Sequence, residues 1–399
     1  MESTPHDATE ALFSPPSSAP NTPTPQGSGF RCQLSREHLL PALTLMQAIA
    51  EPRTSLPILS HVFLEARPHN TLELRATDLE IGLSRQCPAT VKTAGARTAD
   101  ARRLYEIVRA LPPGSLTLES TLAHSLTITQ DKRRFRLLSL DPSEFPQLAP
   151  AGESVQTIEL PAARLTELLD RTSFAVCPDD TRANLHSLLF ACGPDEQVRC
   201  AASDGHRLAI IARPVPGVPA DVVPILLPYK GLTEARRLLE LIKDDTVTIA
   251  FGAAVSVLTV GSTTLSLRLV EGEFPDYEQV IPRTHTHRLA IPRAELVAAL
   301  HRVIVLTTER ARGVTCDIDT GTLALSVNTP DLGEGSEELA IDYQGSGLTV
   351  GFNGRYLLDF CTAVEPAEQV VMKLANETTP ALLRIVQRVG DCRAGYAHP

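Results

Sequence analysis

The amino-acid sequence predicts an α+β protein made of three repeated units, each a mostly antiparallel sheet with two helices. A length of 399 residues exceeds what one ordinary hydrophobic core needs, and 43% of the residues are apolar, enough to build several cores. Segments of similar pattern recur about every 130 residues, and apolar residues alternate in the stretches between the helical segments. Such alternation is typical of strands with one buried face.

The first element of each unit is the end of an apolar strand followed by an amphipathic helix. The pattern appears as LSREHLLPAL from Leu34, LPAARLTELL from Leu160 and IPRAELVAAL from Ile291, which lie 126 and then 131 residues apart. Apolar residues three and four positions apart cover one helical face. We therefore expect a helix near the start of every unit.

An apolar strand that closes on a polar turn comes next, and a second helix follows it. The strand appears as LELRATD, VRCAASD and LALSVNTPD, in which Thr77, Ser203 and Thr329 are each 126 residues apart. The second helix appears as DARRLYEIVRAL, PYKGLTEARRLL and FNGRYLLDF, whose aligned leucines are 128 and 125 residues apart. Markers that share one register indicate a true repeat.

A last strand precedes a Phe-Pro pair in the first two units. It appears as RFRLLSLDPSEFPQL and TLSLRLVEGEFPDY, and the sequence shows no third copy. The repeat divides the chain into domains at 30–150, 151–282 and 283–399, each close to the commonest domain size. Residues 1–29 are rich in Pro, Ser and Thr and contain no Lys or Arg, so we expect a disordered tail.

The composition excludes several classes of function. A net charge of −10 argues against a protein that coats nucleic acid with its whole surface, and 4% aromatic residues without Trp argue against stacking on single strands. Eight cysteines without a CxxC pair favour reduced thiols over a zinc site or a disulfide framework. No apolar run is long enough for a membrane span, and the N-terminus lacks the pattern of a signal peptide. We expect a cytoplasmic protein without metal or cofactor.

The stretch CAASDGHRLAI, residues 200–210, places Ser203, Asp204 and His206 close together in a pattern that suggests a catalytic site. A nucleophile and its base must lie within hydrogen-bond reach, whereas side chains at i, i+1 and i+3 of a turn diverge. The sequence also lacks GxSxG, P-loop, HExxH and GxGxxG motifs. We therefore expect no catalytic residues. The stretch is then either part of a binding site or a turn that Asp204 and His206 merely cap.

Six stretches resemble one known family in order and spacing. They are RTSLPILSHVFLEA at 53–66, LRATDLEIGL at 74–83, SDGHRLAI at 203–210, LPYKGL at 227–232, EGEFPDYEQVIP at 271–282 and GFNGRYLLDF at 351–360. From Phe30 nearly to its end the chain is similar to the bacterial sliding clamps, the beta subunits of DNA polymerase III. The resemblance implies three clamp domains per chain, with sheets outside and paired helices inside. It also implies that two chains join head to tail as a homodimeric ring around double-stranded DNA.

The same resemblance implies a DNA-facing surface and a dimer interface. The positions that match DNA-facing residues are Arg53, Arg103, Arg109 and Lys230. The positions that match the ring joint are Phe135, Leu137, Val305 and Leu306. Basic residues would attract phosphates without reading bases, so a ring could slide. The alternatives are a solvated helix face for the basic residues and ordinary core or edge positions for the apolar ones.

The resemblance further implies a pocket between the second and third domains for short peptides rich in Gln, Leu and Phe. In the family such peptides come from the replicative polymerase, the clamp loader and repair proteins. Apolar walls suit Leu and Phe side chains, and a few fixed polar groups orient a peptide backbone. The positions that match the pocket are Leu160, Ser203, Gly205, His206, Arg207, Leu208, Pro275, Gln279 and Val280.

Two features depart from the family pattern. Gln279 stands where family pockets often carry an arginine, so a charged contact is missing. After Tyr396 the sequence has only Ala397, His398 and Pro399, without the methionines and proline that line the family's pocket. These departures leave an alternative open, in which the chain is a clamp paralogue with an altered partner pocket, such as a resistance or mobile-element variant.

Overall fold

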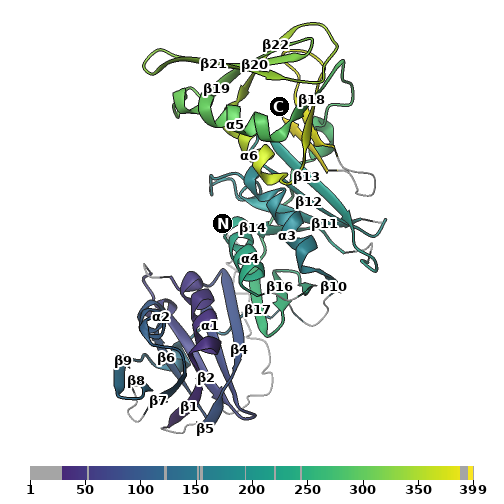
Figure 1. Cartoon of the computed structure of the whole chain (residues 1–399). Coiled ribbons are helices and arrows are strands. Elements are labelled where there is room, and N and C mark those ends of the chain that lie inside the picture. The colour runs from purple at the N-terminus through teal and green to yellow at the C-terminus, as the bar shows by residue number, and fades with distance from the viewer. Residues whose placement is uncertain are drawn as a thin grey trace, which may run out of the picture.

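The computed structural model describes residues 29–398, apart from 52–53, 121–123, 151, 153–155, 194, 220–221, 243–244 and 387–393. For residues 394–398 it describes the backbone only. The predicted tail, except for its last residue, lies outside the described residues. Figure 1 shows three units in a row, each with strands and a pair of helices. The predicted α+β fold of three similar units is confirmed.

As far as the structure describes the chain, the three units share one order of elements, except that the first has an additional strand, β5, and the third lacks the short helix after its last strand. The first contains β1 (Phe30–Ser35), α1 (Arg36–Ile49), η1 (Pro57–Ser60), β2 (His61–Arg67), β3 (Thr71–Thr77), β4 (Ile81–Pro88), β5 (Thr90–Thr93), β6 (Gly95–Asp100), α2 (Ala101–Ala110), β7 (Ser115–Ser120), β8 (Ser125–Gln130), β9 (Arg133–Leu138) and η2 (Pro142–Glu144). The second contains β10 (Gln156–Pro161), α3 (Ala162–Asp170), η3 (Ser173–Ala175), β11 (Ser187–Gly193), β12 (Gln197–Ser203), β13 (Leu208–Pro214), β14 (Ile225–Pro228), α4 (Tyr229–Leu241), β15 (Thr246–Phe251), β16 (Val255–Val260), β17 (Thr263–Arg268) and η4 (Tyr277–Val280). The third contains β18 (His287–Pro292), α5 (Arg293–Val303), η5 (Ile304–Leu306), β19 (Gly313–Asp319), β20 (Thr322–Thr329), β21 (Gly333–Ala340), β22 (Leu348–Asn353), α6 (Gly354–Ala363), β23 (Gln369–Leu374), β24 (Ala381–Ile385) and β25 (Ala394–His398).

The helices begin where the sequence supplies a start signal. Ser35, Asp100 and Asn353 cap α1, α2 and α6, because their side chains accept a hydrogen bond from a backbone N–H in the first turn. The other three helices each follow a proline, at 161, 228 and 292. Within each unit the two helices pack against each other, and α1 also contacts α4 of the next unit. None of the helices in the described part of the chain is long and apolar enough to cross a membrane.

Two sheets continue across the boundaries between units. In one, β17 of the second unit pairs antiparallel with β4 of the first, with Leu265 opposite Leu83. In the other, β25 of the third unit pairs with β13 of the second, with Ala397 opposite Leu208. The last strand of each later unit therefore completes the sheet of the unit before it. The sequence showed no third copy of this strand, and the structure places β25 in that position.

The same pattern leaves one strand at the edge of the sheet at each end of the row. In the described part of the chain β9 pairs only with β8, although β17 and β25 each have a neighbour on the corresponding side. Likewise β21 pairs only with β20, although β4 and β13 each have a further neighbour. Unpaired edges present free backbone N–H and C=O groups to a partner strand.

Candidate functional site

The turn at residues 203–208 joins β12 to β13 and is held by its own side chains. The Ser203 hydroxyl donates to the carbonyl of Arg207 at 2.8 Å and accepts from the N–H of Gly205 at 3.1 Å. The Asp204 carboxylate accepts from the N–H groups of His206 at 2.9 Å and Arg207 at 3.0 Å. These bonds commit both side chains to the backbone. The arrangement offers no relay from a base to a nucleophile.

Gly205 occupies a position that only glycine fits well. Its φ of 88° lies in the left-handed region, which costs other residues energy. A Cβ there would also lie 2.9 Å from the Arg182 guanidinium, which donates to the carbonyl of Asp204 at 3.1 Å. Gly205 thus lets Arg182 pack closely against the turn.

Arg207 ties the second domain to the third. Its guanidinium donates to Asp204 at 3.1 Å and to Asp359 of α6 at 2.8 Å, and it also donates to the carbonyl of Phe174. The ring of Tyr356, also on α6, lies 4.3 Å from the guanidinium carbon. The Arg207 side chain is only 12% exposed. Its hydrogen bonds hold the Arg207 side chain in place below the turn, so little of its surface is free to contact a ligand.

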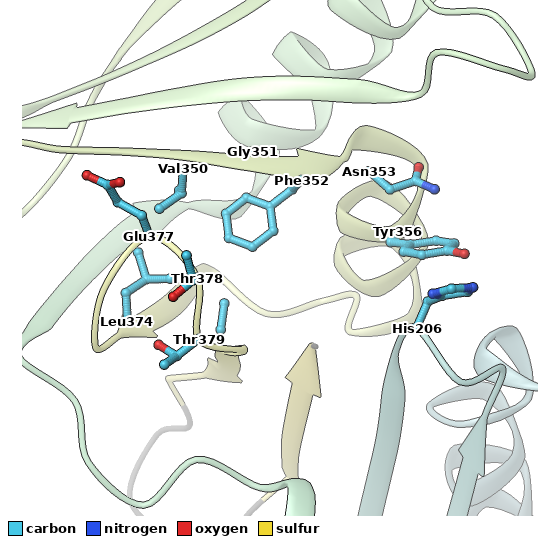
Figure 2. A pocket seen from close by; sticks show the side chains of 11 residues that line it. His206, Val350, Gly351, Phe352, Asn353, Tyr356, Leu374, Glu377, Thr378 and Thr379 are labelled. Atoms are coloured by element: carbon cyan, nitrogen blue, oxygen red, sulfur yellow. The ribbon is translucent and has the colours of Figure 1, made fainter.

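A pocket of about 490 Å³ lies between the turn and the third domain. Figure 2 shows the rings of His206 and Tyr356 next to each other at one end, with Asn353 beside them. Val350 and Phe352 of β22 form an apolar wall. The other end is lined by Leu374 at the end of β23, by Glu377, Thr378 and Thr379 of the following loop, and by Ala381 at the start of β24. The pocket combines apolar walls with a few polar groups, which suits a short peptide.

Leu208 lies beneath a second apolar surface next to the turn. It packs with Leu382 of β24, and both leucines are buried, with at most 4% of either exposed. Ile210, Tyr277 and Ile281 lie partly buried against this pair and form the surface itself. Tyr277 was not predicted as a pocket residue, but its linker carries three positions that were, Pro275, Gln279 and Val280. Gln279 donates to Asp276 at 2.8 Å, and Val280 is exposed. The linker therefore brings its residues to the Leu208 side of the turn.

One predicted pocket residue is not brought to this site. Leu160 lies in β10, opposite Val247 of β15, and only 1% of it is exposed. It belongs to the main hydrophobic core, so its side chain is not accessible to a docked peptide. Asn353 and Tyr356, in contrast, line the pocket although the sequence analysis did not select them. Both residues lie in GFNGRY, at the start of the second helix of the third unit, which the repeat does identify. The sequence does not reveal that this helix start faces the turn at 203–208.

Three of the four predicted DNA-facing residues belong to the part of the chain that the structure describes, and these three lie on helices. Arg103 and Arg109 are exposed on α2, and Lys230 is 44% exposed on α4. Lys230 forms an ion pair with Asp78 of the first domain, and Glu51 lies 3.9 Å away. Lys230 thus contributes to the joint between the first two domains as well as to the helix surface. Arg53 lies outside the described residues.

The predicted ring-joint residues lie beside the two edge strands. Phe135 and Leu137 are on β9, and Phe135 is 40% exposed. Val305 and Leu306 are on η5, and Val305 is 74% exposed. Leu306 packs against β21, because a Cβ on Gly335 would lie 2.8 Å from its methyl group. An exposed valine next to an open strand edge is typical of a surface that a partner covers.

Comparison with known proteins matches all three domains to the domains of one family. Family models for the DNA polymerase III beta subunit match its N-terminal domain at residues 30–149, its central domain at 159–276 and its C-terminal domain at 278–390. The beta sliding clamp of Caulobacter vibrioides is 33% identical over 362 residues, which are 89% of this chain and 95% of that protein. The beta sliding clamp of Pseudomonas putida is 34% identical over 91% of this chain and 97% of its own length.

The chain belongs to the beta sliding clamp family.

Solved structures of this family superimpose on nearly the whole chain. The crystal structure of the Pseudomonas aeruginosa sliding clamp bound to griselimycin matches with a TM-score of 0.86 at 31% identity, covering 93% of this chain and 98% of that one. Within the described residues, no group of three or more His, Cys, Asp or Glu side chains could hold a metal ion.

Replacing Asp204 tests whether the turn and the joint depend on one carboxylate. Asp204→Ala removes the acceptor for two backbone N–H groups and one partner of Arg207, so we expect the free energy of unfolding to fall by about 1–3 kcal/mol. Denaturant unfolding of the full chain measures this value. The exposed Asp180→Ala is the matched control and should change it by less than about 0.5 kcal/mol. Equal losses in the two variants would contradict the assigned role of Asp204.

Proposed function

We propose that two copies of this chain close into a ring around double-stranded DNA and hold the replicative polymerase and other partners on it through the pocket at His206. In this role the chain is a non-catalytic processivity factor of DNA polymerase III that works in the cytoplasm. The observation that carries the proposal is the pair of open strand edges, β9 and β21, at the two ends of a row of otherwise joined domains.

The internal joints define how the ring closes. The strands β4, β13 and β21 occupy equivalent positions in the three domains. Each joint pairs the last strand of one domain with this strand of the domain before it, as β17 pairs with β4 and β25 with β13. Along this repeat β9 corresponds to β17, and β21 corresponds to β4. A second copy can therefore repeat the same joint twice, with β9 of each chain against β21 of its partner. Two such head-to-tail joints close a dimer with no edge left over.

The two edges carry opposite charges. The exposed basic residues of β9 are Arg133, Arg134 and Arg136. The acidic residues of β21 are Glu334, Glu337 and Glu338. Apolar side chains lie beside both sets, with Leu138 79% exposed at the end of β9 and Val305 exposed next to β21. Opposite charges favour the pairing of β9 with β21 and disfavour that of either strand with its own copy.

The basic residues on the helices support a diffuse attraction to DNA. Arg103, Arg109 and Lys230 would contact phosphates and not base edges, so they set no fixed position on the sequence. The net charge of −10 makes a strong hold on DNA by charge alone unfavourable. Encirclement explains how such a protein stays on DNA, because a closed ring needs no tight contact.

The pocket supports binding of short partner peptides. The rings of His206 and Tyr356 and the amide of Asn353 provide polar groups at one end, and Val350 and Phe352 provide an apolar wall. The partly buried side chains of Ile210, Tyr277 and Ile281, which cover Leu208 and Leu382, extend the site on the other side of the turn. Leu and Phe side chains suit both surfaces, and glutamine suits the polar end.

Reversing the charge of one edge tests ring closure. Arg133→Glu with Arg134→Glu places like charges against β21, so we expect a monomer where the unchanged protein forms a dimer. Light scattering measures the mass in solution. Arg236→Glu with Arg237→Glu on α4 changes the net charge equally, away from the edges, and should leave the dimer intact.

A second reversal checks the pairing of the two edges. Mixing the β9 variant with a Glu334→Arg, Glu338→Arg variant should restore a dimer, because one joint then pairs the two reversed edges and the other pairs two unchanged edges. A β9 variant that remains a dimer, or a mixture that stays monomeric, would show that the ring closes elsewhere.

Replacing the rings at the pocket tests the tether. His206→Ala and Tyr356→Ala should each weaken binding of a Gln/Leu/Phe peptide about tenfold, since each removes a ring that a bound peptide would cover at the polar end of the pocket. Fluorescence anisotropy with a labelled peptide measures the affinity, and Asp180→Ala serves as the control. If the unchanged protein binds no such peptide, the alternative of a clamp paralogue with an altered pocket is favoured instead.

A further inference from the structure

Three basic side chains share the outer face of the sheet that joins the second and third domains. Arg288 of β18 lies directly opposite Lys373 of β23. Lys373 lies opposite Leu382 of β24, and Arg384 follows two residues later, so it points to the same face. Side chains opposite each other on a sheet are about 5 Å apart at Cβ, and diagonal neighbours about 7–8 Å. The three cations are therefore close neighbours.

His285, in the segment before β18, lies near the same cations. Burial lowers the pKa of His285, and the charges of Lys373 and Arg384 lower it further. The Nδ1 atom of His285 and the Nε atom of Arg384 are both buried, and neither has a hydrogen-bond partner among the described residues. Buried polar nitrogens without partners are uncommon and indicate a missing ligand or water.

Two acidic groups of the neighbouring linker, Asp276 and Glu278, have other partners. Asp276 accepts a hydrogen bond from Gln279, and Glu278 lies 3.3 Å from Arg199 of β12. Within the described residues, no carboxylate comes within 4 Å of the basic atoms of Arg288, Lys373 or Arg384. Like charges that face each other without a counter-charge are destabilising, and an anion would relieve that cost.

The cations border the apolar surface at Leu208. Leu382 packs on Leu208 and lies directly opposite Lys373, so it is shared by the apolar surface and the cationic group. Tyr277 and Ile281 of the linker lie against the same two leucines. Leu208 and Leu382 are themselves buried, so a peptide would rest its apolar side chains on the partly buried Tyr277 and Ile281. Its flanking residues would then lie near Lys373 and Arg384.

We propose that His285, Arg288, Lys373 and Arg384 form a site for a carboxylate of the partner peptide, next to the apolar side chains that anchor it. This proposal rests on the proposed function, since it specifies which peptides bind at the joint between the second and third domains. The site favours partners whose Leu/Phe anchor is flanked by Asp or Glu. Lys373 and Arg384 supply the charge beside Leu382, and His285 and Arg288 border the group on the linker side and on β18.

Two peptides and two double variants test this selectivity in the full chain. Both peptides carry the same Gln/Leu/Phe anchor, one flanked by Asp and Glu and the other by Asn and Gln. The unchanged protein should bind the acidic peptide about fivefold more tightly, as expected for two ion pairs at a partly exposed site. Lys373→Met with Arg384→Met should abolish that difference and bind the neutral peptide as the unchanged protein does. Lys92→Met with Arg102→Met, which replaces exposed residues of the first domain, should keep the preference.

The outcomes separate this inference from the proposed function. If neither peptide binds the unchanged protein, the proposed binding of partner peptides is itself refuted. If both bind equally, or if the preference survives in the Lys373→Met, Arg384→Met variant, the carboxylate site is wrong. A titration with inorganic phosphate gives one more check. Millimolar phosphate that occupies the site without weakening the acidic peptide would show a site for free anions, which also overturns the proposal.

Discussion

Antiparallel pairing of strands across the domain joints is the constraint on which the rest of this structure depends. Because β17 completes the sheet that contains β4, and β25 completes the sheet that contains β13, neighbouring domains cannot rotate without breaking backbone hydrogen bonds. The shared sheets keep successive helix pairs in a fixed relation, as the contact between α1 and α4 shows. They also leave complementary edges at the two ends of the row. A ring follows from repeating one joint.

The joint between the second and third domains also carries the site. The turn at 203–208 is rigid because Ser203 and Asp204 hold its backbone, and Arg207 fixes it to α6 through Asp359. The pocket is therefore built from two domains, and its shape depends on how they meet. Arg207 acts here as a positioning residue, whereas His206 and Tyr356 offer surface to a ligand. A motif that looked catalytic is a structural connection with one exposed ring.

Much of the fold could be predicted from the sequence, because helix and strand periods and the repeat are local signals. The six helices fall where the repeat placed them. The strand β25 could not be predicted, because AGYAH lacks the apolar alternation of RFRLLSL and is recognisable only by its place between β13 and β24. Leu160 shows the limit of matching positions: an apolar residue at a strand end can line a pocket or fill a core, and only packing decides. Tyr356 gains its role from the turn that carries Arg207, more than 140 residues away in the chain, a relation that no local pattern records.

The central claim is that the protein is held on DNA by encirclement. The most direct test is to load the full-length protein onto a nicked circular DNA, raise the salt concentration and then cut the circle. A ring predicts retention at high salt on the intact circle, since phosphate contacts are screened but the topology is unchanged, and rapid loss once the DNA has ends. Loss from the intact circle at high salt, or retention that is the same on circular and linear DNA, would contradict it.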